Sequence, residues 1–299
     1  MTDPFNNHPE VKKTRFPKWL RRKLPEGGAL FQTGAIIDKY KLNTVCEEAK
    51  CPNRLECYSH QTATFLALGS ACTRACGFCD IDFSKEPLPL DPQEPERIAA
   101  SVKELGLQHV VITMVARDDL PDQGASQIGA IITATRNTSP GCTIEVLTSD
   151  FNGNMEALRS LLRFSPEIFN HNIETVRRLS PRVRHKATYD RTLSVLKEAK
   201  ETGLAHFVKS GIMVGLGETE DEVKETIRDL HAAGCDIITI GQYLQASRKK
   251  IKVKAFIEPD LFKTYESYGL SLGVRAMYCG PFIRSSYNAG KILEKLKIK

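Results

Sequence analysis

The sequence predicts an α/β protein: a partial (β/α)6 TIM-like barrel with extensions at its N- and C-terminal ends. Two observations support this fold class. Six short β-branched or apolar runs recur along the chain, and in most cases a loop and a helical pattern follow. In addition, a glycine of the kind that ends helices stands just before three of these runs. Strands and helices in regular alternation form a parallel sheet.

The elements follow one another in a regular order. The predicted strands are 62–68, 109–113, 143–148, 167–170, 207–214 and 236–241. Two of the segments between them carry apolar side chains at i, i+4 and i+7, which is the stripe of an amphipathic helix. These stripes are Ile98, Val102 and Leu105 after Pro95, and Val223, Ile227 and Leu230 after Thr219. The glycines that end helices are Gly106, Gly203 and Gly234.

Length and composition favour a soluble globular protein. The chain has 299 residues, of which 41% are hydrophobic and 26% charged, and no apolar run approaches the twenty residues of a membrane span. The first residues are polar and basic, so we expect no secretory signal, no membrane association and a cytoplasmic location. We place the barrel at 61–279, an N-terminal extension at 1–60 and a C-terminal extension at 280–299.

The net charge of +6 is concentrated in local runs. They comprise Lys12, Lys13, Arg15, Lys18, Arg21, Arg22 and Lys23, and later Arg248, Lys249, Lys250, Lys252 and Lys254. One interpretation is a solvated surface, and the other is an acidic partner attracted by complementary charge. With one Trp and no recognition motif, the sequence favours a protein over nucleic acid as that partner.

Six of the nine cysteines form two sets of three with different spacing. The first is Cys46, Cys51 and Cys57, and the second is Cys72, Cys76 and Cys79. Thiolates are the ligands of iron-sulfur clusters, and three of them leave one iron corner open. Zinc is less favoured because no His falls within either set. Disulfides are less favoured because the chain is long and has no apolar signal segment.

The position of the second cysteine set in the chain favours a role in an active site. Cys72 to Cys79 comes directly after the first predicted strand, and parallel α/β folds place their chemistry at the carboxyl ends of strands. The string CTRACGFC, with CxxxCxxC after a first strand and Phe78 before the last Cys, resembles the radical S-adenosylmethionine (SAM) superfamily. This resemblance implies a cluster whose open iron binds the methionine part of SAM, and cleavage of SAM to a 5′-deoxyadenosyl radical.

The first cysteine set points to one family within this superfamily. CEEAKCPNRLEC, together with RSSY near the end of the chain, is similar to the pattern of the lipoyl synthase family, over nearly the whole chain. The resemblance implies two 4Fe–4S clusters and SAM as cofactors. It also implies insertion of two sulfur atoms at carbons 6 and 8 of a protein-bound octanoyl-lysine, with the auxiliary cluster at the first set supplying the sulfur. An unactivated methylene has no acidic proton, so cofactor chemistry is required.

The resemblance also implies roles for individual residues. Ser286, rather than Ser285, is the expected fourth ligand of the auxiliary cluster, and Arg284 is expected to orient groups nearby. The expected SAM contacts are Phe78, Asp118, Asn172, Glu174 and Gly215. Structural alternatives are an ordinary surface arginine for Arg284, a core aromatic for Phe78, and a capped turn for Asn172 and Glu174. His171 is equally a candidate structural histidine.

Two stretches depart from the family pattern. Ala116 and Gln123 stand where Asp and Gly are common, which leaves the SAM contact at Gln123 open. The stretch QASRKKIKVKAF has Ala246, Lys249 and Lys250 where relatives carry Pro and His. This second change is expected to alter contact with a partner rather than chemistry.

The resemblance implies several partners. They are octanoylated carrier proteins (the lipoyl domains of 2-oxoacid dehydrogenases and the glycine cleavage H protein), a reductant such as flavodoxin or ferredoxin, and an iron-sulfur carrier for cluster repair. Three other functions remain open: a non-catalytic iron-sulfur carrier, another sulfur-inserting radical enzyme and a zinc-stabilised nucleic-acid binder. The spacing of the first cysteine set and RSSY favour the lipoyl synthase pattern.

Overall fold

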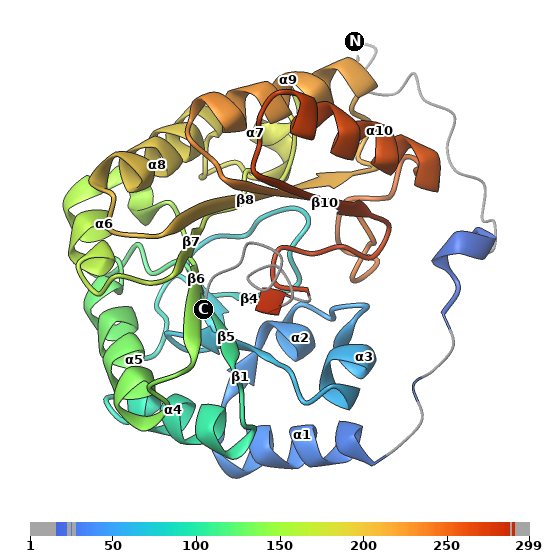
Figure 1. Cartoon of the computed structure of the whole chain (residues 1–299). Helices are drawn as coiled ribbons and strands as arrows, with labels where there is room; N and C mark the ends of the chain where they lie inside the picture. The colour runs from blue at the N-terminus through green and yellow to red at the C-terminus, as the bar shows by residue number, and fades with distance from the viewer. Residues whose placement is uncertain (1–15, 23–24, 26–27, 288, 291–299) are drawn as a thin grey trace.

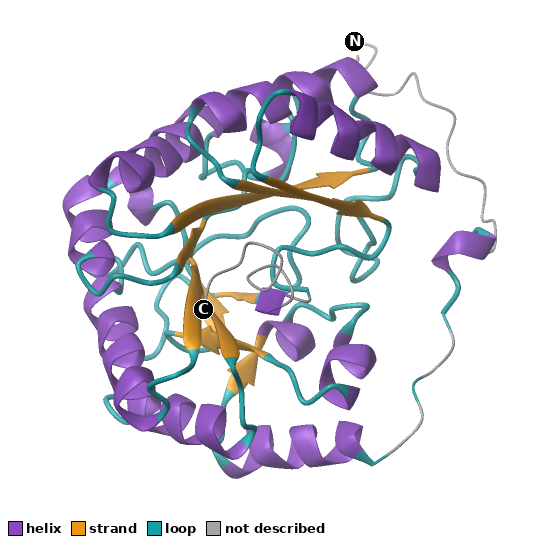
Figure 2. Cartoon of the chain, in the orientation of Figure 1, coloured by secondary structure: helices purple, strands orange, loops and turns teal. Residues whose placement is uncertain are grey.

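The computed structural model describes residues 16–22, 25, 28–287 and 289–290. Within these ranges the helices form an outer arc that runs from α1 to α10, and the strands of one sheet lie inside the arc (Figures 1 and 2). The short helices α2 and α3 and residues 281–287 lie on the concave side (Figure 1). Parts of both predicted extensions, with Lys12, Lys13, Arg15 and Lys23, lie outside the described residues.

One curved sheet organises the molecule. Its order is β1-β2-β5-β6-β7-β8-β9-β10, and every neighbouring pair is parallel except β1 and β2. The strands are β1 (Asn43–Thr44), β2 (Thr64–Ala67), β5 (His109–Met114), β6 (Thr143–Leu147), β7 (Ile168–Asn170), β8 (Phe207–Val214), β9 (Ile237–Gln242) and β10 (Ala276–Gly280). A second, two-stranded sheet pairs β3 (Ala71–Cys72) with β4 (Asp82–Phe83).

The helices cover the outer face of the sheet. They are α1 (Ala29–Lys39), α4 (Glu94–Glu104), α5 (Ala125–Thr138), α6 (Met155–Leu162), α8 (Tyr189–Thr202), α9 (Glu220–Ala232) and α10 (Pro259–Ser271). The short helix α7 (Ser180–Val183) lies inside this arc, where the carbonyl oxygen of Val183 accepts from the N–H of Gly77 at 3.0 Å. The concave side carries α2 (Val45–Glu48) and α3 (Arg54–Ser59), and two 3-10 turns are η1 (Lys18–Leu20) and η2 (Phe151–Gly153). Within the described ranges, no helix combines the length and apolar character needed to span a bilayer.

The structure confirms the predicted partial barrel. All six predicted strands are present as β2, β5, β6, β7, β8 and β9, and each is followed by at least one helix before the next. The predicted helical stripes are buried on α4 and α9, with side chains at most 7% exposed. A further parallel strand, β10, follows the sixth unit. Its sequence, AMYCG, has no β-branched residue and precedes a proline, so it lacked a strand signal.

Local chemistry fixes the ends of these helices. Gly203 ends α8 in the left-handed conformation, with φ of 65°. This conformation costs glycine little free energy because glycine has no side chain. At the start of α9, Thr219 and Glu222 form a reciprocal capping box with the backbone. Because β8 and β9 are parallel neighbours, the loops that follow them lie at the same end of the barrel.

A buried ion pair lies inside the barrel. Lys209 Nζ on β8 lies 3.0 Å from both carboxylate oxygens of Glu145 on β6, and neither side chain is exposed. Asn170 on β7 donates to the same carboxylate at 2.6 Å. Burial raises the pKa of Glu145, but the charges of Lys209 and His109 outweigh it, so the net pKa lies below the usual value. The pair therefore ties three adjacent strands together.

We predict that Glu145→Ala lowers the free energy of unfolding by about 3–5 kcal/mol, because it leaves the Lys209 charge buried without a partner. Urea denaturation followed by circular dichroism under anaerobic conditions measures the change. The matched control is Glu198→Ala, which removes the partner of Arg159, a side chain that is 46% exposed, and should cost less than about 1 kcal/mol. Equal effects of the two substitutions would contradict this account of the barrel interior.

Candidate active site

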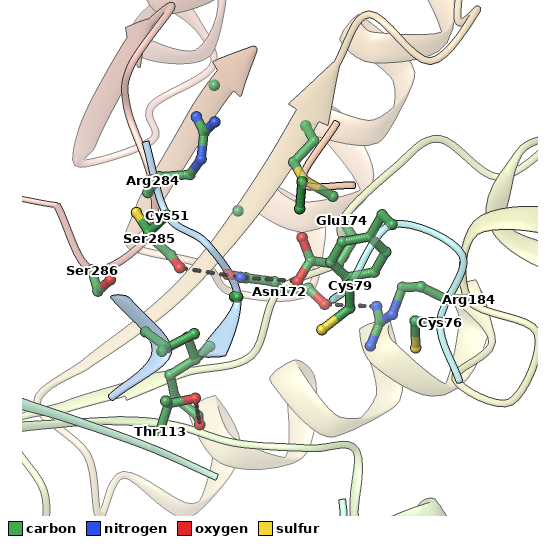
Figure 3. A pocket seen from close by; sticks show the side chains of 18 of the residues that line it. Cys51, Cys76, Cys79, Thr113, Asn172, Glu174, Arg184, Arg284, Ser285 and Ser286 are labelled. Atoms are coloured by element: carbon green, nitrogen blue, oxygen red, sulfur yellow. Dashed lines mark hydrogen bonds between the residues drawn. The ribbon is translucent and has the colours of Figure 1, made fainter. Parts of the chain in front are cut away.

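A pocket of about 310 Å³ lies at the carboxyl edge of the sheet (Figure 3). Its walls come from the carboxyl-terminal halves of β5, β6, β8 and β9, from the loop after β7 and from the C-terminal segment. The predicted site residues that line it are Cys51, Cys72, Cys76, Phe78, Cys79, Asn172, Glu174, Arg284 and Ser286. Both cysteine sets therefore contribute to one pocket, of a size typical for small-molecule sites.

The second cysteine set lies on a closed loop. Cys72 ends β3, and the loop returns as β4, so that Cys72 pairs with Phe83 across the small sheet. The backbone N–H of Ser84 also donates to the carbonyl oxygen of Cys72 at 3.0 Å. Cys76 and Cys79 lie between these two strands. The short sheet therefore holds the two ends of the cysteine loop together.

Arg74 anchors this loop to the barrel. Its side chain is 5% exposed and forms two hydrogen bonds with Asp118, at 2.9 and 2.6 Å. Its third contact is Asp150 Oδ1, at 2.6 Å. Burial alone would raise the pKa of Asp118 and of Asp150, but Arg74 lowers both below their usual range. Asp118, a predicted SAM contact, does not line the pocket but fixes the loop that carries Cys72 and Cys76.

The first cysteine set is carried by two short helices. Cys46 lies in α2, Cys57 in α3, and Cys51 in the turn between them. The hydroxyl of Thr44 caps α2 by accepting from the N–H of Glu47, and it also bonds to the hydroxyl of Tyr58 at 2.9 Å. Of this set, Cys51 faces the pocket.

The thiols have the chemistry of cluster ligands. Burial raises the pKa of Cys46, Cys57 and Cys79 to about 12, and the neighbouring thiols of each set add to the shift. The pKa of Cys76 is raised for the same reasons. All nine cysteines are free. Such thiols need a bound cation to be held as thiolates, and iron in a cluster supplies that charge.

Zinc and iron-sulfur sites require different arrangements of thiolates. A structural zinc ion requires four donors that converge on one point. In an iron-sulfur cluster each thiolate binds its own iron corner, so the thiolates stand further apart. The thiols of both sets are unbridged, as cluster ligands must be.

The C-terminal segment folds back onto the first cysteine set. Asn53 Nδ2 donates to the carbonyl oxygen of Phe282 at 2.7 Å, and the hydroxyl of Tyr287 donates to Glu56 Oε1 at 2.5 Å. Arg22 stacks on the ring of Phe282, 3.6 Å from its centre, and pairs with Glu56. We call these five residues, Arg22, Asn53, Glu56, Phe282 and Tyr287, the C-terminal clamp. The clamp places residues 284–286 beside Cys51 (Figure 3).

A glycine makes room for this segment. A Cβ atom on Gly241, near the end of β9, would lie 1.9 Å from the carbonyl oxygen of Ile283 and 2.9 Å from Arg284 Nη1. Any other residue at this position would push the segment away from the sheet. Gly241 is therefore a close-approach glycine that sequence reasoning did not single out.

Asn172 connects the two sides of the pocket. Its Nδ2 donates to Glu174 Oε1 and to Ser285 Oγ, both at 3.1 Å (Figure 3). Its Oδ1 is buried without a hydrogen-bond partner among the described residues. Burial raises the pKa of Glu174, which Arg184 and Arg284 only partly offset. These oxygens offer acceptors to an ammonium or hydroxyl group in the pocket.

The two serines of RSSY have different surroundings. Ser285 accepts from Asn172, whereas Ser286 Oγ makes no hydrogen bond to any described residue. Burial lowers the pKa of Arg284, and the neighbouring Glu174 acts against this shift. Arg284 is half-buried and lines the pocket, so it is not an ordinary surface arginine.

The other predicted residues divide into two groups. Phe78 is half-buried and lines the pocket, as does His171. Both ring nitrogens of His171 are engaged, with the carbonyl oxygen of Thr148 and the hydroxyl of Thr192, and burial together with Arg184 lowers its pKa to about 4. Gly215, with φ of +100°, does not line the pocket but packs against Gln242 and Ala255 of its own chain. Its contact with SAM stays a prediction.

Several functional positions had no decisive signal in the sequence. Arg74 lies inside CTRACGFC, and Asn53 and Glu56 lie inside CEEAKCPNRLEC, so both motifs contained them without distinguishing them from the cysteines. Arg184, which donates to the carbonyl oxygen of Asn172 at 2.7 Å, lies in no recognised motif. Such contacts depend on tertiary structure and not on spacing.

Comparison with known proteins decides the family. The Radical SAM superfamily pattern matches residues 66–230. The lipoyl synthase of Protochlamydia amoebophila is 62% identical over 287 residues, covering 95% of this chain and 89% of the relative. The chain belongs to the lipoyl synthase family. The lipoyl synthase of Chlamydia muridarum is 57% identical and covers 94% of this chain and 91% of its own.

Solved structures agree with this family at the level of the fold. Methylornithine synthase has a TM-score of 0.51 at 14% identity, over 78% of this chain and 80% of that one. Streptococcus suis SuiB bound to S-adenosylmethionine has a TM-score of 0.56 at 14% identity, over 76% of this chain and 53% of that one. The lipoyl synthase family uses SAM and 4Fe–4S clusters, to which the thiols of this pocket are suited.

We predict that Tyr287→Phe loosens the C-terminal clamp. A hydrogen bond to a carboxylate contributes about 1.5–3 kcal/mol, so amide exchange in residues 282–287 should accelerate about tenfold or more. Hydrogen-deuterium exchange with mass spectrometry measures this. The matched control is Tyr40→Phe, which removes a hydroxyl bonded to Glu104 on the outer surface. Exchange at 282–287 that is the same in both variants would contradict the role of the clamp.

Proposed function

We propose that this chain inserts two sulfur atoms, at carbons 6 and 8, into an octanoyl group carried on a lysine of a carrier protein, to give lipoyl-lysine. Membership of the lipoyl synthase family supports this function. The observation that carries it is that both cysteine sets contribute to one pocket, where Cys51 and the CxxxCxxC loop face the same space. A radical formed at one set therefore acts on a substrate that is within reach of the other.

The two cysteine sets have different roles in this proposal. Cys72, Cys76 and Cys79 hold the cluster that works with SAM. The auxiliary cluster is held by four ligands, which are Cys46, Cys51, Cys57 and Ser286. When bound, SAM and the two clusters supply the 5′-deoxyadenosyl radical and the sulfur atoms of the product. The N-terminal extension, at 1–60, and the C-terminal extension, at 280–299, thus complete a site built on the barrel at 61–279.

Side chains of the pocket bind and orient SAM and the octanoyl chain. Glu174 and Asn172 Oδ1, which has no hydrogen-bond partner among the described residues, would accept hydrogen bonds from the amino or hydroxyl groups of SAM, and Phe78 would pack near its adenine. Arg284 balances negative charge between the two sites. The apolar wall formed by residues such as Met114 and Leu147 keeps water from the radical and receives the octanoyl chain. Asp118 contributes by holding Arg74, and Gly215 remains a candidate for contact with the nucleoside.

The serine ligand fits a cluster that is consumed. Oxygen is a harder donor than thiolate and is a poorer match for an iron-sulfur site, so it is displaced more easily. Ser286 makes no hydrogen bond to any described residue, whereas the hydroxyl of Ser285 accepts from Asn172, so Ser286 is the better candidate for this role. Ser285 then fixes the position of the segment while Ser286 binds iron.

The proposed function requires several partners in the cytoplasm. The carriers are the octanoylated lipoyl domains of 2-oxoacid dehydrogenases and the glycine cleavage H protein. Flavodoxin or ferredoxin supplies electrons, and an iron-sulfur carrier restores the auxiliary cluster. Neither nucleic acid nor a membrane takes part.

A mass spectrum of an octanoyl-lysine peptide tests the proposal. The peptide is incubated anaerobically with reconstituted protein, SAM and a strong reductant. The expected product has gained two sulfur atoms and, after closure of the ring, lost two hydrogens. Unchanged peptide beside abundant 5′-deoxyadenosine would indicate a radical enzyme with another substrate. Absence of SAM cleavage would instead favour a non-catalytic iron-sulfur carrier.

Two cysteine substitutions separate the roles of the sets. Cys51→Ala should leave 5′-deoxyadenosine formation intact and abolish sulfur insertion, whereas Cys76→Ala should abolish both. Chromatography of the nucleoside and mass spectrometry of the peptide give the two readouts. Cys142→Ala, at a buried cysteine outside both sets, is the matched control and should retain both activities. Normal 5′-deoxyadenosine formation by the Cys76 variant would refute the division of roles.

A further inference from the structure

The edge of the pocket carries positive charge. Lys50, Asp80 and Ala246 line the pocket, and the side chain of Lys50 is 60% exposed, which places it at the entrance. The chain continues from Ala246 into a basic turn with Arg248, Lys249 and Lys250. We call Lys50, Arg248, Lys249 and Lys250 the basic rim.

The turn that carries the basic rim is held in place. Gln245 Nε2 donates to the carbonyl oxygen of Lys250 at 2.8 Å, and the hydroxyl of Tyr243 donates to that of Ile251 at 2.7 Å. The N–H of Ile251 donates to the carbonyl oxygen of Gly77, inside the CxxxCxxC loop, at 3.0 Å. These contacts bind the turn to the pocket, so its cations keep a fixed position relative to the site.

The positive charge of the rim is only partly neutralised within the chain. Asp80 pairs with Lys50 and accepts from the hydroxyl of Ser247 at 2.7 Å. Arg248 and Lys249 are exposed and form no ion pair with any described residue. The rim therefore has cations available for a negatively charged partner.

We propose that the basic rim docks the carrier protein, by binding an acidic face that surrounds its octanoyl-lysine. This inference rests on the proposed function. A substrate attached to a lysine brings the surface of its carrier to the entrance of the pocket. Complementary charge at that surface raises the rate of encounter and orients the carrier, and it acts less at high salt.

The test compares a carrier with a short peptide. The variant is Arg248→Glu with Lys249→Glu, and its substrates are an intact octanoylated carrier domain and a neutral octanoyl-lysine peptide. Dithionite serves as the reductant, so that no electron-donor protein is present. Because the auxiliary cluster is consumed, single-turnover rates are measured as a function of substrate concentration. We expect the second-order rate constant for the carrier domain to fall about tenfold or more at low salt, mainly through a higher half-saturating concentration, and the loss to shrink at high salt. The rate constant for the peptide should stay unchanged.

The matched control is Lys103→Glu with Lys197→Glu, which makes the same change in net charge on exposed positions of α4 and α8. It should leave both substrates unaffected. An unchanged second-order rate constant for the carrier domain would overturn the proposal, as would an equal loss with the peptide, which would indicate distortion of the pocket.

Two other outcomes have distinct meanings. A loss seen only when an acidic electron-donor protein replaces dithionite would assign the basic rim to that donor and overturn the carrier assignment. If unaltered protein inserts sulfur into neither substrate, the proposed function fails and not the docking inference alone.

Discussion

The hydrogen bond from Asn53 to the carbonyl oxygen of Phe282 joins parts of the chain that are 229 positions apart. The rest of the site depends on this closure. The sheet alone brings the CxxxCxxC loop and the loop after β7 to one edge, because parallel strands end together. It does not supply the first cysteine set or RSSY. The C-terminal clamp brings these two together, and the hydrogen bond between Asn172 and Ser285 fixes them to the barrel.

The charged side chains around the pocket divide between support of the cysteine loop and contact with a ligand. Arg74 is buried and satisfied by two carboxylates behind the cysteine loop, so the loop is held without using a charge inside the pocket. The pocket itself contains Glu174 and Arg284, whose pKa values are shifted toward neutrality by burial. Partly buried ionisable groups such as these interact strongly with a bound ligand, because little water screens their charge. Perturbed groups gathered in one cleft are typical of functional sites.

The sequence was sufficient for the strands, the helix ends and the two cysteine sets, because hydrophobic periodicity, glycine caps and thiol spacing are local signals. It was insufficient for β10, whose five residues have no strand pattern, and for the ion pair between Asp118 and Arg74. A contact of Asp118 with SAM stays a prediction. Which of two adjacent serines faces the first cysteine set also depends on how the last segment folds back. Gly241 matters only because Ile283 approaches it from a distant part of the chain.

The central claim is that sulfur passes to the substrate from a cluster held within the same pocket as the radical source. The most direct measurement is a single turnover with protein reconstituted from ³⁴S-labelled sulfide, followed by mass spectrometry of the thiolated product. The account predicts that both inserted sulfur atoms carry the label, and that Cys51→Ala yields no thiolated product. Unlabelled sulfur in the product would contradict it, because the donor would then be something other than a reconstituted cluster.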